Sequence, residues 1–306
     1  FPNICRSSAP GFVGIPVYAV TTSNSSSLNR QQPEHMASEA EIADLRCWAE
    51  SQDTLKGLSL PDEVLAKFLE VATADDSRVE AARRRLADFC RVRASKTKGA
   101  ADWFEYPDVS SEPIQELLSV GYVVQLGYDD NGAAVVLFRS GLWQPDRVSF
   151  EDMSRYMNMC YDVLCADPAT RTAGLVTMVD FQGFEMRHLS YWSRDATKKL
   201  SAIQDAYPVK LKHVNYFNTS TVFNALYELL KMFMSKSVKE LVRVHKSSKE
   251  SLQSEIPARI LPAEYGGTGA DIKQLAEQWR SKIELQLPSE AAKYAGVVYN
   301  DTADSE

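Results

Sequence analysis

The chain has 306 residues, of which 44% are hydrophobic and 25% are charged, and its formal net charge is −7. This composition is typical of a soluble globular protein, and the length is sufficient for one large domain or two ordinary ones. The negative charge argues against a dedicated nucleic-acid-binding protein, and no run of residues approaches the roughly 18 apolar positions that a membrane-spanning helix needs.

The first 35 residues have a composition that does not favour folding. The chain begins at Phe1, and the segment Thr21–Pro33 is rich in Ser, Asn and Gln. Such a polar segment cannot bury enough apolar surface to become ordered. It also lacks the basic start and apolar core of a secretory signal. We therefore expect residues 1–35 to be a flexible, disordered leader.

Residues 36–110 are predicted to form a helical N-terminal region. Ser38 and Glu41 have the spacing of a capping box, which predicts that a helix begins there. A second helix is expected from about Ser59 and a third from about Asp76, because apolar residues recur at helical spacing after each position.

From residue 111 the pattern changes to strands that alternate with helices. Two β-rich runs lie within Gly121–Gly141 around an Asp-Asn-Gly turn signal, so we expect a hairpin there. The elements expected next are a helix from about Ser149, a buried strand over Gly174–Phe181, a helix over Leu189–Asp205 and a strand over Leu211–Phe217. This order predicts an α/β fold with a mostly parallel sheet.

The segment Val222–Met234 is predicted to be an unusually apolar helix. Its three polar residues, Asn224, Glu228 and Lys231, form one narrow stripe, whereas a surface helix is normally apolar over only about 100°. Two interpretations stay open. The helix is either a central core helix, or it packs on the domain with one face while its other face covers an apolar cavity or contacts a bilayer. The basic residues within Lys236–Lys246 favour the second.

No sequence motif indicates an enzyme. The chain lacks the patterns of a hydrolase nucleophile, a dinucleotide-binding loop and a phosphate-binding loop. Its four histidines have no metal-ligand spacing, and its five scattered cysteines predict free thiols in a reducing compartment. Asp180 is either an acid or base or, as we favour, a carboxylate that caps the turn after a strand. We therefore expect no catalytic residue, metal or cofactor, and a cytoplasmic location.

Four segments resemble a known family in sequence and order. They are VTMVDFQGF (Val176–Phe184), AYPVKLKHVNYFN (Ala206–Asn218), FMSKSVKELVRVH (Phe233–His245) and RILPAEYGGT (Arg259–Thr268). Together they resemble the CRAL-TRIO lipid-binding family, in particular its branch of α-tocopherol transfer protein, retinaldehyde-binding protein and clavesin. The resemblance covers about residues 36–283. It implies a CRAL-TRIO βαβ domain over 111–285, in which the sheet is the floor of an apolar pocket closed by a gate helix, followed by a flexible tail over 286–306.

The resemblance also implies which residues line the pocket. The expected lining consists of a floor with Thr177, Val179, Val214 and Tyr216, a helical wall with Ser154, Met157, Asn158 and Tyr161, and a gate with Val222, Phe223, Leu226, Leu230 and Phe233. These positions agree with the spacing of strands and helices, although the two faces of either strand could be exchanged. The alternative for each residue is an ordinary place in the core.

A basic patch that contacts an anionic membrane or phosphoinositide head groups is also implied by the resemblance. Its residues are Lys210, Lys212, Lys236, Lys239 and Arg243. The sequence departs from the family at Glu70 and Val71, where the family is rich in arginine, and at Ser237 and Leu241, where basic residues are expected. These departures argue against phosphoinositide-gated release, whereas general contact with membranes is still expected.

We therefore expect a cytosolic, monomeric carrier that contacts membranes peripherally and binds one tocopherol, retinoid or carotenoid. Burial of hydrocarbon is worth about 0.8 kcal/mol per CH₂, so a lipid can be withdrawn from water without a catalytic group. Sulfur and aromatic side chains between Met153 and Tyr161 suit a ring or a polyene. The alternatives are a storage protein with a gate that rarely opens, a phospholipid- or phosphoinositide-binding regulatory module, and a protein-interaction module.

Overall fold

The computed structural model describes residues 36–72 and 77–303, so the leader predicted for residues 1–35 lies outside the described residues. The longer helices are α1 (Glu39–Glu50), α2 (Asp62–Glu70), α3 (Arg78–Ala94), α4 (Glu112–Ser119), α5 (Phe150–Ala166), α8 (Arg194–Ala206), α9 (Thr221–Lys231) and α12 (Ile272–Lys293). The shorter helices are α6 (Pro168–Thr172), α7 (Met186–Leu189), α10 (Lys236–Leu241) and α11 (Lys249–Gln253). Within these residues no helix is both long enough and apolar enough to cross a membrane.

The N-terminal helices form as the sequence predicts. The Ser38 side chain accepts a hydrogen bond from the Glu41 amide, and the Glu41 carboxylate accepts one from the Ser38 amide, so the capping box is confirmed. Helix α2 begins three residues later than expected, with Pro61 at its N-cap position, because a residue that precedes proline is disfavoured in a helix. Helix α3 follows Ser77 at its own N-cap position.

Five strands form one sheet, and its mostly parallel character is confirmed. The strands are β1 (Val123–Tyr128), β2 (Ala134–Arg139), β3 (Leu175–Asp180), β4 (Leu211–Phe217) and β5 (Val242–Lys246), and they lie side by side in that order. The hairpin partners β1 and β2 are antiparallel, and every other neighbouring pair is parallel.

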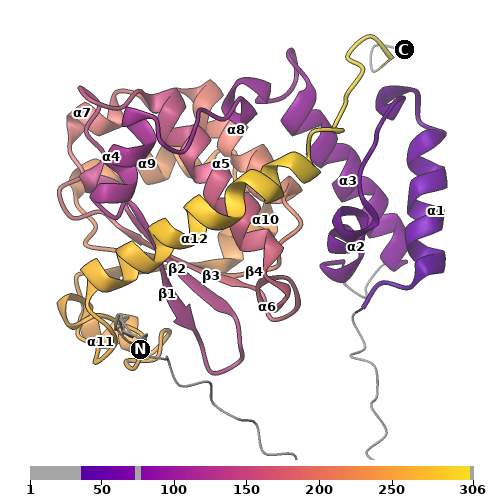
Figure 1. Cartoon of the computed structure of the whole chain (residues 1–306). Helices are drawn as coiled ribbons and strands as arrows, with labels where there is room; N and C mark the ends of the chain where they lie inside the picture. Colours follow the sequence, from indigo (N-terminus) through magenta and orange to yellow (C-terminus); the bar gives the residue numbers. More distant parts are fainter. Residues whose placement is uncertain (1–35, 73–76, 304–306) are drawn as a thin grey trace, which may run out of the picture. The chain divides into compact units, whose positions relative to one another are not determined.

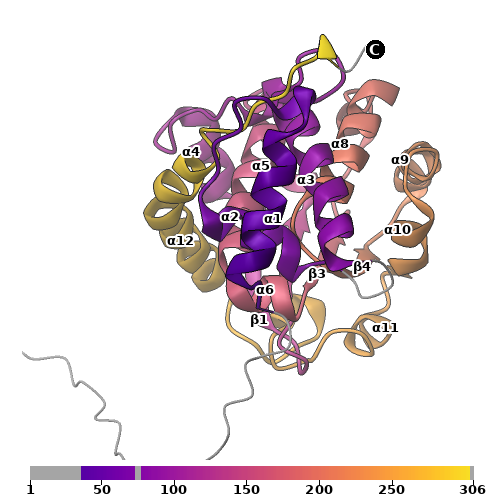
Figure 2. The same cartoon turned by 90° about the vertical axis from the view of Figure 1, so that its right-hand side faces the viewer.

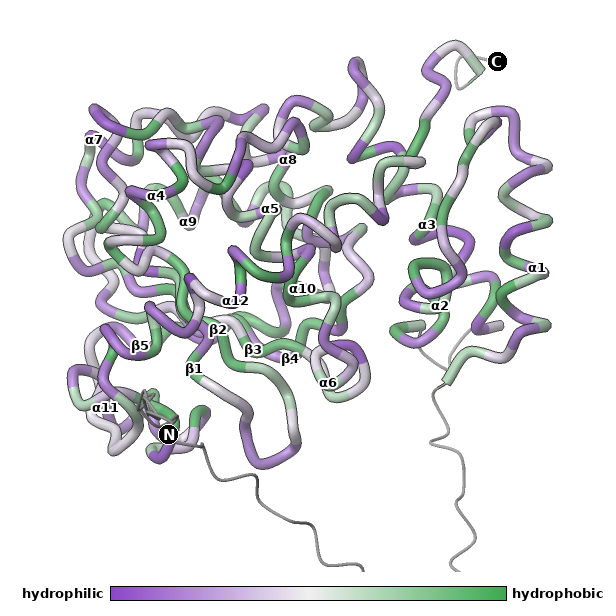
Figure 3. The backbone as a smooth tube through the Cα atoms, in the orientation of Figure 1, coloured by the Kyte–Doolittle hydropathy of each residue, from purple (hydrophilic) through white to green (hydrophobic). Residues whose placement is uncertain are grey.

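Helices cover both faces of the sheet (Figure 1). On one face, strand residues such as Val136 pack in a core that also contains Met153 of α5. On the other face, Met178 packs in a second core with Tyr265 of the turn that precedes α12. Helix α12 contacts β1 at the edge of the sheet and joins both cores. The hydrophobic colouring of Figure 3 is accordingly concentrated on the strands and on the inner helix α5.

The segment after β4 differs at its end from the helix predicted over Val222–Met234. Helix α9 ends at Lys231, and a separate helix, α10, begins after Ser235, whose side chain accepts a hydrogen bond from the Val238 amide. The basic continuation then forms β5, in which Val242 pairs with Val214. The helix predicted over residues 189–205 begins five residues later, as α8, because Ser193 caps its start, and Leu189 is instead the last residue of α7.

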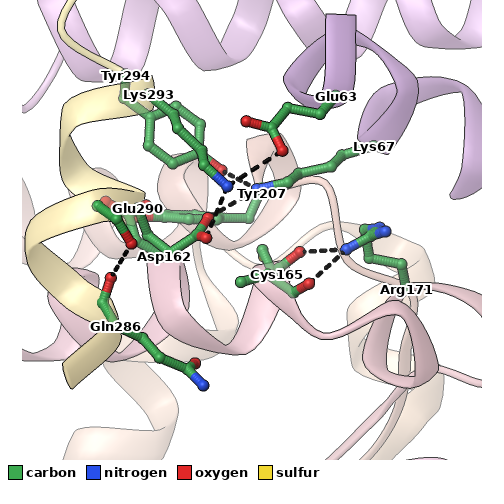
Figure 4. Close-up of polar contacts among 12 residues, drawn as sticks. Glu63, Lys67, Asp162, Cys165, Arg171, Tyr207, Gln286, Glu290, Lys293 and Tyr294 are labelled. Atoms are coloured by element: carbon green, nitrogen blue, oxygen red, sulfur yellow. Dashed lines mark hydrogen bonds and ion pairs between the residues drawn. The ribbon is translucent and has the colours of Figure 1, made fainter. Parts of the chain in front are cut away.

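The C-terminal segment is ordered further than predicted. Helix α12 continues to Lys293, and Lys67 of α2 donates to Glu290 at 3.3 Å in a buried ion pair (Figure 4). Beyond the helix, the Ser95 hydroxyl donates to Asp301. The described part of the predicted flexible tail, residues 286–303, is therefore anchored to the N-terminal helices.

Candidate ligand-binding cavity

An apolar cavity lies between the face of the sheet that carries α5 and the helices α5, α8 and α9. Its volume, taken as the space open to the centre of a water molecule, is about 100 Å³. Strands β2, β3 and β4 supply its floor, the three helices supply its walls, and connecting segments before α5 and after β3 also contribute. The cavity is therefore built from segments that lie far apart in the sequence.

The four predicted floor residues all line the cavity. Thr177 pairs with Val214 and Val179 pairs with Tyr216 across the parallel strands β3 and β4. Because side chains alternate along a strand, this register brings all four to the same face. Their role as contacts of a ligand stays a prediction.

The residues of α5 that line the cavity differ in part from the predicted wall, and the lining face is shifted by about one residue around the helix. Met157 and Tyr161 line the cavity as expected, and Met153 joins them one turn earlier. The structure places Ser154 and Asn158 outside the lining, because each polar group bonds to a backbone carbonyl. The Ser154 hydroxyl donates to Phe150 O at 2.8 Å, and the Asn158 amide donates to Trp103 O at 3.1 Å.

Helix α9 contributes fewer residues than predicted. Leu226 and Leu230 line the cavity, whereas Phe223 is buried behind it, with its ring 4.6 Å from that of Phe181. Val222 also lies outside the lining, and Phe233 follows the end of α9, where its carbonyl accepts a hydrogen bond from Ser201. Of the five residues predicted for the gate, Leu226 and Leu230 line the cavity and the other three do not.

Much of the lining was not predicted from the sequence, and most of this part is aromatic. The residues concerned include Tyr122, Phe138, Trp143, Phe181, Phe184 and Trp192, together with the polar Gln204. The alternation of side chains along a strand could have predicted the position of Phe138, because Phe138 lies two residues after Val136 in a predicted strand. The tryptophans lie in connecting segments, where no periodicity indicates which way a side chain points.

The cavity is uncharged. Within the described part of the chain, none of the residues that line it is an aspartate, glutamate, lysine, arginine or histidine. Its tyrosines are also neutral near pH 7, because burial raises the pKa of Tyr161 to about 12 and raises that of Tyr216 as well. The arrangement can therefore solvate an apolar molecule, but it cannot neutralise an ionic one.

Asp180 and the segment RILPAEYGGT meet on the opposite face of the sheet. Tyr265 donates its hydroxyl to Asp180 Oδ2 at 2.8 Å, while Asp180 Oδ1 accepts from the Gln182 amide at 2.9 Å and from Asn218 Nδ2 at 2.8 Å. Burial and the neighbouring Asp180 charge raise the pKa of Tyr265. Asp180 thus has the turn-capping role that the sequence favoured, and it joins the start of α9 to this segment.

The two glycines of the same segment serve the turn itself. Gly266 has φ of 84°, a conformation that other residues rarely adopt. A Cβ atom on Gly267 would lie 1.9 Å from the Leu261 carbonyl oxygen. The turn can therefore close against Leu261 only with glycine at Gly267.

The five predicted basic-patch residues all lie outside the cavity lining. Lys210, Lys236 and Lys239 are exposed, and Lys212 and Arg243 are half-buried. Arg243 lies in β5 rather than on a helix and donates to the Glu240 carbonyl. Membrane contact through these residues stays a prediction.

Comparisons with known proteins agree with this architecture. Residues 118–267 match the model of the CRAL/TRIO domain. Alpha-tocopherol transfer protein-like of Homo sapiens is 26% identical over 217 residues, which are 70% of this chain and 60% of that protein. Clavesin-1 of Rattus norvegicus is 28% identical over 141 residues, 46% of this chain and 40% of that protein. This chain thus matches at most about 60% of the length of these relatives.

A solved structure also resembles the chain. The crystal structure of Sfh5 superposes with a TM-score of 0.51 over 78% of this chain and 87% of that one, at 16% sequence identity. At this identity the likeness concerns the fold alone. It confirms the predicted α/β fold, with a helical N-terminal region followed by a mostly parallel sheet.

Proposed function

Because residues 118–267 of this chain form a CRAL/TRIO domain, we propose that the protein binds one neutral hydrophobic ligand in the cavity and carries it between membranes. The candidates are a tocopherol, a retinoid and a carotenoid. The observation that carries this proposal is the uncharged, largely aromatic lining between the sheet and α9.

The lining favours a neutral ligand over a phospholipid. Each buried CH₂ group contributes about 0.8 kcal/mol to retention of the ligand. A phosphate or carboxylate in the same cavity would lose its hydration and gain no cationic partner, which is strongly unfavourable. A phospholipid head group would therefore have to stay outside the cavity.

Entry of such a ligand requires that the cavity enlarge. A volume of about 100 Å³ is smaller than the roughly 300–1,000 Å³ of pockets that hold drug-sized molecules. Helix α9 is the wall best suited to move, because it lies at the outer edge of the molecule in Figure 2 and ends after Lys231. We propose that its outward displacement opens the cavity.

Contact with an anionic membrane would promote this opening. Lys236 and Lys239 follow α9 directly, and Met232, which lies between the two helices, is 56% exposed. Each lysine near an anionic surface contributes about 1 kcal/mol to binding. The proposed protein is accordingly a cytosolic monomer that associates peripherally with membranes.

The carrier function is tested by measuring which lipid the full chain retains after contact with vesicles. The protein is incubated with vesicles that contain α-tocopherol, retinol and zeaxanthin, re-isolated, and examined by native mass spectrometry and absorption spectroscopy. We expect one neutral lipid per chain, and slower amide hydrogen exchange in α9 when it is bound. Failure to retain any of the three would overturn the proposal, and recovery of a vesicle phospholipid instead would support the regulatory module.

The membrane contact has its own test. Exchange of Lys236 and Lys239 for glutamate is expected to weaken binding to vesicles that contain phosphatidylserine by at least about tenfold. Lys273→Glu, at an exposed lysine of α12, serves as the control and should change binding much less. If the two variants lose vesicle binding equally, α10 does not belong to the membrane-facing surface.

A further inference from the structure

We infer that Thr177 is the polar anchor of the cavity, and that the ligand is a neutral lipid with a hydroxyl or carbonyl oxygen rather than a pure hydrocarbon or a charged lipid. This inference rests on the proposed function and deepens it. The observation behind it is a buried hydroxyl that the protein itself leaves without a partner.

The position of Thr177 is central to the cavity floor. It lies in the middle of β3, opposite Val214 of β4, and its side chain faces the cavity. The residue is only 6% exposed, and within the described part of the chain its Oγ1 has no hydrogen-bond partner. A threonine hydroxyl can donate one hydrogen bond and accept two, so a residue of the cavity floor carries an unused donor and acceptor.

Two polar side chains beside Thr177 in the sheet have hydrogen-bond partners, in contrast to its own hydroxyl. On the other face, Asp180 accepts three hydrogen bonds, and the Asn215 side chain bonds both to the Thr177 carbonyl and to His245. Buried polar groups nearly always have partners in folded proteins. The remaining partner of the Thr177 hydroxyl is therefore expected to be an oxygen of the ligand.

The other buried atoms without partners do not offer the same opportunity. The Tyr156 hydroxyl, Trp279 Nε1 and His213 Nδ1 also have none among the described residues, but these three residues are not part of the cavity lining. Among these four residues, Thr177 is the one that belongs to the cavity lining.

The surroundings of Thr177 also limit the kind of oxygen. The lining holds no charged side chain, and its remaining polar groups include Ser140, Gln204 and the neutral Tyr161. A carboxylate would be buried there without a cation. A hydroxyl or carbonyl, in contrast, needs only the single hydrogen bond that Thr177 can supply.

A set of retinoids with one polyene and different end groups tests this inference in the full chain. The probes are all-trans-retinol, all-trans-retinal, all-trans-retinoic acid and axerophthene, which is retinol without its oxygen. Binding is measured as quenching of tryptophan fluorescence, since Trp143 and Trp192 line the cavity. We expect retinol and retinal to bind about tenfold or more tightly than the acid and the hydrocarbon.

Substitutions then assign the preference to Thr177. Thr177→Val, which keeps the shape of the side chain, is expected to weaken retinol binding about tenfold and to leave axerophthene binding unchanged or improved. Thr177→Ser keeps a hydroxyl and should retain much of the preference. The matched control is Thr197→Val, at a buried threonine outside the cavity whose hydroxyl already donates to the Ser193 carbonyl; it should leave both affinities unchanged.

The outcomes separate this inference from the proposed function. If retinol and axerophthene bind equally, or if Thr177→Val affects neither, the inference is overturned while the carrier function stands. The same comparison is made with α-tocopherol and its deoxy analogue. If no retinoid, no tocopherol and no zeaxanthin binds the unaltered chain, both the inference and the proposed function are overturned.

Discussion

The two faces of β3 and β4 consist of alternate residues of the same strands, yet one face is filled and the other is hollow. Val176, Met178 and Phe217 belong to a core that Tyr265 helps to close. Thr177 and Val214, their neighbours along the strands, face a cavity of about 100 Å³. The difference is not one of composition, because valine is present on both faces.

The polar groups follow the same division. On the filled face Asp180 and Asn215 have hydrogen-bond partners within the protein, whereas on the hollow face the Thr177 hydroxyl has none in the described part of the chain. This contrast indicates that the ligand capacity lies on the hollow face, whereas the side chains of β3 and β4 on the filled face are packed against other parts of the protein. Substitutions on the two faces should therefore have separable effects.

The largest difference is expected when buried side chains are shortened. Met178→Ala should lower the free energy of unfolding by about 2–5 kcal/mol, because it leaves a void in a filled core. Val179→Ala, one residue further along β3, removes atoms that already border a cavity and should cost less. Urea denaturation measures both, and equal losses would contradict the division between the faces.

Larger side chains should also affect the two faces differently, because only the hollow face has room for added atoms. Val176→Phe inserts atoms into the filled core and should destabilise the fold by about 1–3 kcal/mol. Val214→Phe can occupy the cavity, so its stability should stay within about 1 kcal/mol of the original while retinol binding is lost. Thermal unfolding and retinol titration are the measurements. Retained retinol binding in Val214→Phe would show that the ligand lies elsewhere.

Removal of a hydroxyl should distinguish the two faces on a smaller scale. Tyr265→Phe takes a donor from the buried Asp180 carboxylate and should cost about 1–3 kcal/mol. Thr177→Val removes a hydroxyl that has no partner, so the free energy of unfolding should stay the same or rise. Chemical denaturation of the two ligand-free variants tests this. A clear destabilisation by Thr177→Val would show that the hydroxyl is satisfied within the protein.

The smallest effect is expected from pH. His245 of β5 bonds to Asn215 on the filled face, and its burial lowers its pKa; Glu255 opposes this shift and Arg243 reinforces it. Since the folded state then binds its proton less readily than the unfolded chain, the stability that His245 contributes is complete above about pH 6.5 and is lost as the pH falls through the lower, folded pKa.

The measurement is the difference in unfolding free energy between the unaltered chain and His245→Gln, taken from pH 8 to pH 5. The difference should shrink as the pH falls, because only the unaltered chain carries this titrating group. Use of the difference removes the pH dependence of all other groups. A constant difference over this range would contradict a lowered pKa for His245.

Much of the fold could be predicted from local patterns, because alternation and helical spacing act over a few residues. The hairpin turn within 121–141, the strand over 211–217 and the capping box at Ser38 all follow from such signals. Strand β5 was missed although Val242 and Val244 alternate with polar residues, because the basic residues of this segment were interpreted only as a charged flank of the apolar helix. Ser235, a good N-cap residue, was the signal that a new helix starts there.

The candidate site was less predictable, because it depends on which long-range partners meet. The alternation of side chains along a strand predicted the floor residues Thr177 and Val179. No local sequence pattern indicates that Asn158 bonds to the Trp103 carbonyl and so lies outside the cavity wall. The same limit applies to Trp192, which lies in a connection. The unpartnered state of Thr177 follows only from the positions of all its neighbours in three dimensions.

The pairing of α2 with α12 has a consequence for how the protein is made. Lys67 and Glu290 lie 223 positions apart, so Lys67 is synthesised long before its carboxylate partner. Until α12 arrives, the apolar surface that Ile283 and Leu287 later cover stays open, and the site of Lys67 holds an uncompensated cation. Chains whose synthesis stops before α12 therefore expose this surface to chaperones and proteases, and only a chain translated past Glu290 can escape them.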